Sequence, residues 1–153
     1  QIVVGPEVSD LVEAAMSARG ALSGIRAADA WPSAPRPVAA DDLLPERAAA
    51  AIVGGAQVAL VRLLDDTVYA VEQHDPFSDA NVMSRGIVGS TVRDGDEIPT
   101  IQSPMYKQPF DLRTGEALGD VPAVLGTWTV AVRDGQVLIG PPLTPARPAE
   151  GAA

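Results

Sequence analysis

Short apolar runs separated by turn-forming dipeptides constrain the fold more than any other feature of this chain. The runs cover residues 49–53, 57–64, 128–132 and 136–139. Gly54-Gly55 separates the first two runs, and Asp134-Gly135 separates the last two. Gly-Gly and Asp-Gly favour two-residue hairpin turns because they accept the positive φ angles that such turns require. We therefore predict an all-β, antiparallel sandwich or barrel of short strands.

The segment between these hairpins is less regular. Asp65-Asp66 is expected to turn the chain into residues 67–71, where the side chains alternate, so residues 57–71 indicate a further hairpin. Residues 72–100 show no comparable alternation and are expected to form a long irregular stretch. The acidic pairs in this chain lie at turns, where carboxylates are common.

Both ends of the chain differ from the middle. Residues 1–37 are interpreted as an N-terminal extension and Pro-rich linker, in which Ser9-Asp10 is expected to cap a helix that reaches about Leu22. This extension is either loosely ordered or an arm that packs on a partner or a second copy. Residues 141–153 are rich in proline and are expected to form an extended or disordered tail. Residues 38–140 then form the domain.

Composition excludes several classes of site. The chain has no cysteine and one histidine, so it cannot build a thiolate site, a disulfide or a multi-histidine metal centre by itself. Its net charge is −9, which disfavours nucleic acid and anionic membranes as partners. No apolar run is long enough to cross a bilayer, and no signal peptide is evident, so a cytoplasmic location is expected.

Several motifs together resemble one protein family. They occupy residues 69–71, 75–78, 81–89, 103–108 and 110–115. The Asp-Pro-Phe-Ser, Ser-Arg-Gly-Ile-Val-Gly and Ser-Pro-Met-Tyr-Lys-Gln sequences among them are specific in combination. Residues 38–140 are similar to the small subunits of assimilatory NAD(P)H-dependent nitrite reductases, which have a Rieske-like fold.

A Rieske domain holds two irons with two thiolates and two imidazoles. By resemblance, the four ligand positions here are Asp75, Phe77, Ser103 and Tyr106, none of which supplies either group. Asp75 is expected to cap backbone N–H groups in its loop, and the rings of Phe77 and Tyr106 are expected to fill the volume of the missing cluster. His74 is expected to lie in a loop and to bind no metal, because a second histidine is missing.

The resemblance implies a non-catalytic accessory subunit with no cofactor of its own. Its expected partner is a large subunit that carries flavin (FAD), sirohaem and an iron–sulfur cluster and reduces nitrite to ammonium in nitrate assimilation. One alternative is a stand-alone binding or regulatory module that reuses the fold without the cluster. An electron-transfer ferredoxin is a further alternative, which the absence of cysteine argues against.

Three polar residues are candidates for a partner interface. Lys107 is the only lysine in the chain, and it is either a solvated loop residue or a contact to an acidic patch on the large subunit. Arg85 is expected to form an ion pair, either internally or across an interface. Gln108 belongs to the same candidate surface. Gly86 and Gly89 are expected at backbone positions with positive φ.

Overall fold

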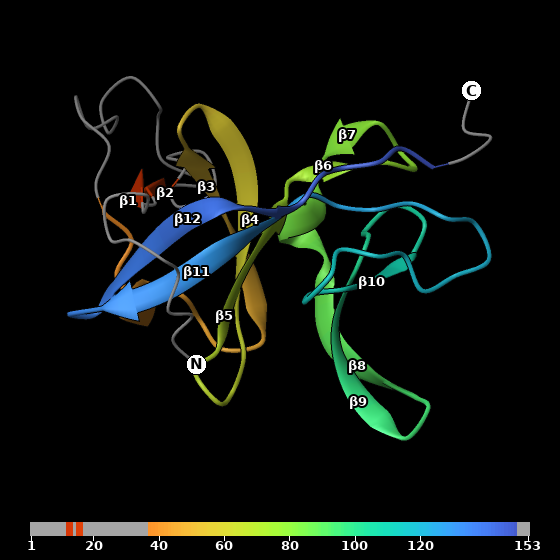
Figure 1. Cartoon of the computed structure of the whole chain (residues 1–153), viewed down its shortest axis with the longest axis horizontal. Helices are drawn as coiled ribbons and strands as arrows, with labels where there is room; N and C mark the ends of the chain where they lie inside the picture. The colour runs from red at the N-terminus through yellow and green to blue at the C-terminus, as the bar shows by residue number, and fades with distance from the viewer. Residues whose placement is uncertain (1–11, 14, 17–36, 150–153) are drawn as a thin grey trace.

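The computed structural model describes residues 12–13, 15–16 and 37–149, and antiparallel strands dominate them (Figure 1). The largest sheet contains, in spatial order, β1 (Val12–Glu13), β12 (Gln136–Thr144), β11 (Thr127–Arg133), β5 (Val68–Glu72), β4 (Ala56–Arg62), β3 (Arg47–Val53) and β2 (Ala15–Met16). The predicted hairpin at Gly54-Gly55 joins β3 to β4, and the one at Asp134-Gly135 joins β11 to β12. The predicted all-β fold is therefore confirmed.

The two ends of the largest sheet are close to each other in the chain. β1 pairs with β12 and β2 pairs with β3, and only one residue separates β1 from β2. The largest sheet therefore curls on itself, and the two short pairings cover part of two edges, on β12 and β3, that would otherwise expose unpaired backbone groups. The helix expected from Ser9 to Leu22 is wrong at Val12–Glu13 and Ala15–Met16, which are strands, and the rest of that segment lies outside the described residues.

A second sheet extends away from the first (Figure 1). Its strands are, in spatial order, β10 (Pro109–Asp111), β9 (Asp96–Gln102) and β8 (Ile87–Arg93). The expectation of an irregular stretch over residues 72–100 is wrong, because β8 and β9 pair along their full length across Asp94-Gly95. The same stretch holds the short hairpin of β6 (His74–Asp75) and β7 (Ala80–Asn81), and a 3-10 turn, η3 (Met83–Arg85).

Strand β4 contributes to two hydrophobic clusters. Val58 and Leu60 face one cluster inside the curled sheet, whereas Ala59 and Val61 face a second cluster between the two sheets. Successive side chains of a strand point to opposite faces, so a strand buried on both faces needs an unbroken apolar run. The second cluster also contains Phe110, which connects the small sheet to the large one.

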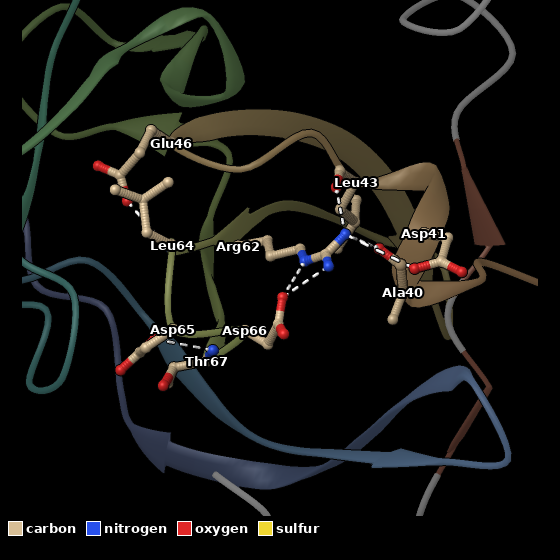
Figure 2. Close-up of polar contacts among 9 residues, drawn as sticks. All are labelled: Ala40, Asp41, Leu43, Glu46, Arg62, Leu64, Asp65, Asp66 and Thr67. Atoms are coloured by element: carbon tan, nitrogen blue, oxygen red, sulfur yellow. Dashed lines mark hydrogen bonds and ion pairs between the residues drawn. The ribbon is translucent and has the colours of Figure 1, made fainter.

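One half-buried arginine attaches the loop before β3 to the turn after β4. The guanidinium of Arg62 donates to the carbonyl oxygens of Ala40 and Leu43, each at 3.1 Å, and to Asp66 Oδ1 at 2.6 and 2.9 Å (Figure 2). At the same turn, Asp65 Oδ1 accepts from the backbone N–H of Thr67 at 2.9 Å, which lowers the pKa of Asp65. These acidic turn residues are therefore structural, as expected.

The C-terminal segment continues the fold past the boundary predicted at residue 140. β12 runs to Thr144, and Arg147 then exchanges two backbone hydrogen bonds with Val124, at 2.8 and 3.0 Å. Ala149 is buried in the second hydrophobic cluster. Residues 145–149 are therefore extended and packed against the domain.

Candidate functional site

The first candidate loop is a short hairpin around a buried carboxylate. Asp75 ends β6, and its Oδ1 atom accepts a hydrogen bond from the backbone N–H of Phe77 at 3.0 Å. Its Oδ2 atom accepts from the hydroxyl of Ser78 at 2.8 Å. The expected capping role of Asp75 is confirmed, and it explains how a fully buried carboxylate is satisfied.

The second candidate loop runs from Ser103 to Gln108 between β9 and β10. Its backbone closes on itself, because the N–H of Lys107 donates to the carbonyl of Ser103 at 3.0 Å and the N–H of Ser103 donates to the carbonyl of Gln108 at 2.9 Å. The Ser103 hydroxyl oxygen accepts from the N–H groups of Met105 and Tyr106 at 3.2 and 3.5 Å. The loop is thus organised around one buried serine.

A single hydrogen bond joins the two loops. Ser103 Oγ donates to Asp75 Oδ2 at 2.6 Å, and both side chains have 0% exposure. Hydrogen bonds to a carboxylate are stronger than those between neutral groups, and more so away from water. Asp75 and Ser103 therefore hold together two loops that are far apart in the sequence.

The two aromatic residues of the candidate site have different environments. Phe77 is half-buried and packs on Phe110 with ring centroids 5.9 Å apart and an interplanar angle of 54°. Tyr106 is 66% exposed. The expectation that both rings fill the volume between the loops is therefore wrong for Tyr106, whose backbone joins the network while its side chain faces solvent.

The side chains at these positions do not fit a two-iron cluster. Such a cluster needs thiolate and imidazole ligands, and the four positions supply a carboxylate, a hydroxyl, a phenol and a phenyl ring. Asp75 and Ser103 are moreover hydrogen-bonded directly to each other. Within the described residues, no three His, Asp or Glu side chains are grouped as metal ligands would be.

Comparison with known proteins places this geometry in a family. Residues 36–140 match the family of Rieske-like [2Fe-2S] domains. The chain is also 36% identical over 98 residues to the nitrite reductase (NADH) small subunit of Salmonella typhimurium, covering 63% of this chain and 87% of that protein. This chain belongs to the Rieske-like nitrite reductase small-subunit family.

A solved structure and a longer protein are also similar to this chain. A solved structure from Mycobacterium tuberculosis, described as an NADH-dependent nitrite reductase small subunit, superposes with a TM-score of 0.60 at 42% identity, covering 67% of this chain and 89% of that one. The nitrite reductase [NAD(P)H] large subunit of Klebsiella oxytoca is 39% identical over 113 residues, which is 72% of this chain. The chain spans only 11% of that large subunit.

The Phe-Asp-Leu-Arg-Thr-Gly segment of this family member forms a tight turn after β10. The buried carboxylate of Asp111 accepts from the backbone N–H of Arg113 at 2.8 Å and from its guanidinium at 2.9 and 3.1 Å. The side-chain hydrogen bond to Asp111 raises the pKa of Arg113. Gly115 has φ of 79° and lies against the backbone of Leu125, so the turn requires glycine there.

His74 and the residues around it line a cavity of about 580 Å³ between the first loop and the C-terminal segment. The Nε2 atom of His74 lies 3.3 Å from Asp79 Oδ1. His74 belongs to the short strand β6, so the expectation that it lies in a loop is wrong. Arg147 and Phe77 also line the cavity.

The three candidate interface residues differ in accessibility. Arg85 and Lys107 are exposed, whereas Gln108 is half-buried, with its amide against Gly119. The Gln108 Nε2 atom has no hydrogen-bond partner among the described residues. The possible internal ion pair of Arg85 does not form within the described part of the chain.

Gln73 is a further residue that shapes this site, although no sequence motif indicates it. Its side chain is buried, and it accepts from the backbone N–H of Ser84 at 2.7 Å and donates to the Ser84 hydroxyl at 2.8 Å. These bonds hold η3 and hence Arg85 next to the first loop. The signal in the sequence is a glutamine directly after the strand that ends at Glu72, because a side-chain amide that becomes buried there needs hydrogen-bond partners.

Proposed function

We propose that this chain is the accessory small subunit of an NAD(P)H-dependent nitrite reductase, and that it acts in cytoplasmic nitrate assimilation. In this proposal it binds no cluster and contributes no catalytic residue. The flavin, the sirohaem and the iron–sulfur cluster belong to the large subunit. The role of this chain is to support that subunit through contact.

The observation that carries this proposal is the double occurrence of the domain among its relatives. It matches a separate small subunit in Salmonella typhimurium and a segment of a large subunit in Klebsiella oxytoca. A domain that is covalently joined to a protein in one organism and separate in another is expected to contact that protein in both. The Asp75–Ser103 hydrogen bond supports a structural role, because it holds the loops together without a metal group.

Reconstitution with the large subunit tests this proposal. The two chains are co-expressed and co-purified, and NADH- and NADPH-dependent nitrite reduction is measured with and without this chain. We expect a stable complex, higher activity in its presence, and no iron in the isolated chain. An unrelated acidic protein at equal concentration serves as the control. Absence of a complex together with unchanged activity would overturn the proposal.

The cavity beside His74 favours a second candidate, a stand-alone binding module. Its volume of about 580 Å³ falls in the range of small-molecule sites, and it is lined by acidic, basic and aromatic side chains. This function requires a ligand that raises the melting temperature of the isolated chain. If a thermal-shift screen of the isolated chain finds no such ligand, the binding-module function is rejected and the accessory-subunit role is the candidate that remains.

A further inference from the structure

Two segments that include strand residues of the small sheet contain basic residues but no acidic residue. Residues 80–93 and 98–110 hold no Asp or Glu, although the whole chain has 20 of them. The first segment includes Arg85, and the second includes Lys107, the only lysine. The two segments hold Arg85, Arg93 and Lys107, three of the 11 basic residues, and none of the 20 acidic residues, so each is locally positive in a protein whose net charge is −9.

The fold brings these two segments together at one end of the small sheet. Ile87, at the start of β8, lies opposite Gln102 at the end of β9, and Gln102 in turn lies opposite Pro109. The η3 turn and the loop from Ser103 to Gln108 therefore flank the same sheet end. This placement explains why charges separated by 22 positions in the sequence can act on one surface.

Exposed apolar side chains lie beside each cation in the sequence, with Ile87 at the start of β8 after Arg85, and Met105 and Tyr106 directly before Lys107. Ile87 is 55% exposed, Met105 is 56% exposed and Tyr106 is 66% exposed. We call Arg85, Ile87, Met105, Tyr106 and Lys107 the docking face. Tyr, Met and Arg are enriched in the centres of protein interfaces, and buried aromatic side chains there carry much of the binding energy.

The two cations of the docking face form no ion pair within the described residues. Arg85 is exposed and its guanidinium makes no contact with a charged or polar group in the described residues, and Lys107 Nζ reaches only the carbonyl of Pro104 in its own loop, at 3.2 Å. By contrast, the guanidinium groups of Arg62 and Arg113 are paired with Asp66 and Asp111. The docking face therefore retains charge that is available to a partner.

The loop that carries Met105, Tyr106 and Lys107 is held by hydrogen bonds to Ser103. Lys107 has φ of 60°, in the left-handed region, which is unfavourable for lysine. The other non-glycine residues with positive φ in the described chain are Glu46 and the four aspartates Asp66, Asp79, Asp94 and Asp134. Backbone strain that the surroundings maintain is a feature of functional loops. The Ser103 network maintains it here.

We propose that the docking face binds a surface of the large subunit that has an apolar centre and an acidic rim. This inference rests on the proposed function and specifies which side of the domain makes the contact. Arg85 and Lys107 pair with carboxylates of the rim, and Tyr106 enters the apolar centre with Met105 and Ile87. Opposite charges across the interface accelerate association and fix its orientation.

Variants that remove one positive charge each test the electrostatic part of this proposal. Lys107→Asn removes the charge and suits the left-handed backbone, so this variant folds at least as well as the wild type. Arg85→Gln removes the second charge, and Arg93→Gln, at the far end of β8, is the matched control. We expect each of the first two to weaken binding to the intact large subunit about tenfold and to reduce its salt dependence, with no change for the control.

Two alanine substitutions, one in the docking face and one outside it, test the apolar part of the docking face. Tyr106→Ala is expected to weaken binding on the order of tenfold to a hundredfold, and Leu64→Ala, at a side chain that is 78% exposed elsewhere, is the control. Binding is measured by calorimetry with the full chain. If wild type binds and all docking-face variants bind equally well, the docking face is wrong while the accessory role stands. If wild type itself does not bind, the proposed function fails.

Discussion

The hydroxyl of Ser103 donates to the carboxylate of Asp75 across 2.6 Å, and neither side chain is exposed to solvent. The two residues are 28 positions apart and belong to different loops. By resemblance to Rieske domains, we infer that those loops correspond to the ones that hold an iron–sulfur cluster there. The contact shows that a buried hydrogen bond holds the two loops together.

Removal of the serine hydroxyl is expected to destabilise the domain. Ser103→Ala removes one of the hydrogen-bond donors to Oδ2 of the buried Asp75 carboxylate. It also leaves the N–H groups of Met105 and Tyr106 without their acceptor. We expect a loss of about 2–3 kcal/mol in the free energy of unfolding, measured by urea titration. Ser78→Ala removes a less buried donor to Asp75 and is expected to cost less. A Ser103→Ala loss under about 0.5 kcal/mol would contradict this interpretation.

Gly86 is required by packing and not by its φ angle. Its φ of −69° is open to any residue, and Gly89 is also absent from the described positions with positive φ, so the expectation for both glycines is wrong. A Cβ atom at Gly86 would meet the backbone oxygens of Gln102 and Met83. Gly86→Ala is therefore expected to cost about 1–3 kcal/mol.

Gly89→Ala is the control for this substitution. A Cβ atom at Gly89 meets no atom within 4 Å, so the free energy of unfolding is expected to stay within about 0.5 kcal/mol of the wild type. Both values come from urea titration of the isolated chain. Equal effects of the two alanines would argue against close packing at Gly86.

Alkaline pH is expected to destabilise the fold through Tyr69. Burial raises the pKa of Tyr69 above its ordinary value of 10.0. The Tyr69 phenol therefore loses its proton at lower pH in the unfolded state than in the folded state. The contribution of the neutral phenol to the free energy of unfolding is intact below pH 10.0 and is lost as pH rises through the folded pKa. Unfolding measured from about pH 9 to about pH 12 is expected to show this decline.

Tyr69→Phe is expected to reduce the alkaline decline, because the variant has no phenol to ionise. Tyr106→Phe, at an exposed ring, is the control and should leave the decline in place. A profile that is unchanged in Tyr69→Phe would assign the alkaline transition to other groups.

The C-terminal segment is expected to contribute to stability through Ala149. Ala149→Glu places a charge in the second hydrophobic cluster, and residues 145–149 are then expected to detach. Detachment loses the paired backbone hydrogen bonds of Arg147, so we expect a cost of about 1–3 kcal/mol and a lower melting temperature. Ala146→Glu, at an exposed position of the same segment, is the control. An equal melting temperature for both variants would show that the segment is not packed in solution.

Local signals predicted the hairpins well and the long-range polar contacts poorly. Gly54-Gly55 and Asp134-Gly135 determine turns through their own backbone preferences, so the strands beside them were predicted. Asp94-Gly95 is an equivalent signal, yet residues 72–100 were interpreted as an irregular stretch because they show no comparable alternation. The helix expected near Val12 depended on intrinsic propensity alone, and pairing with β12 and β3 overrides that propensity.

The sequence by itself determined the all-β class, the family and the absence of thiolate ligands, because these depend on local turn chemistry, on contiguous motifs and on composition. Only the tertiary structure decided that Asp75 bonds to Ser103, that Phe77 is packed while Tyr106 is exposed, and that Arg85 and Lys107 share one sheet end. Each of these depends on which distant segments lie side by side. That arrangement is set by strand register and by burial of two hydrophobic clusters, and no short stretch of sequence encodes it.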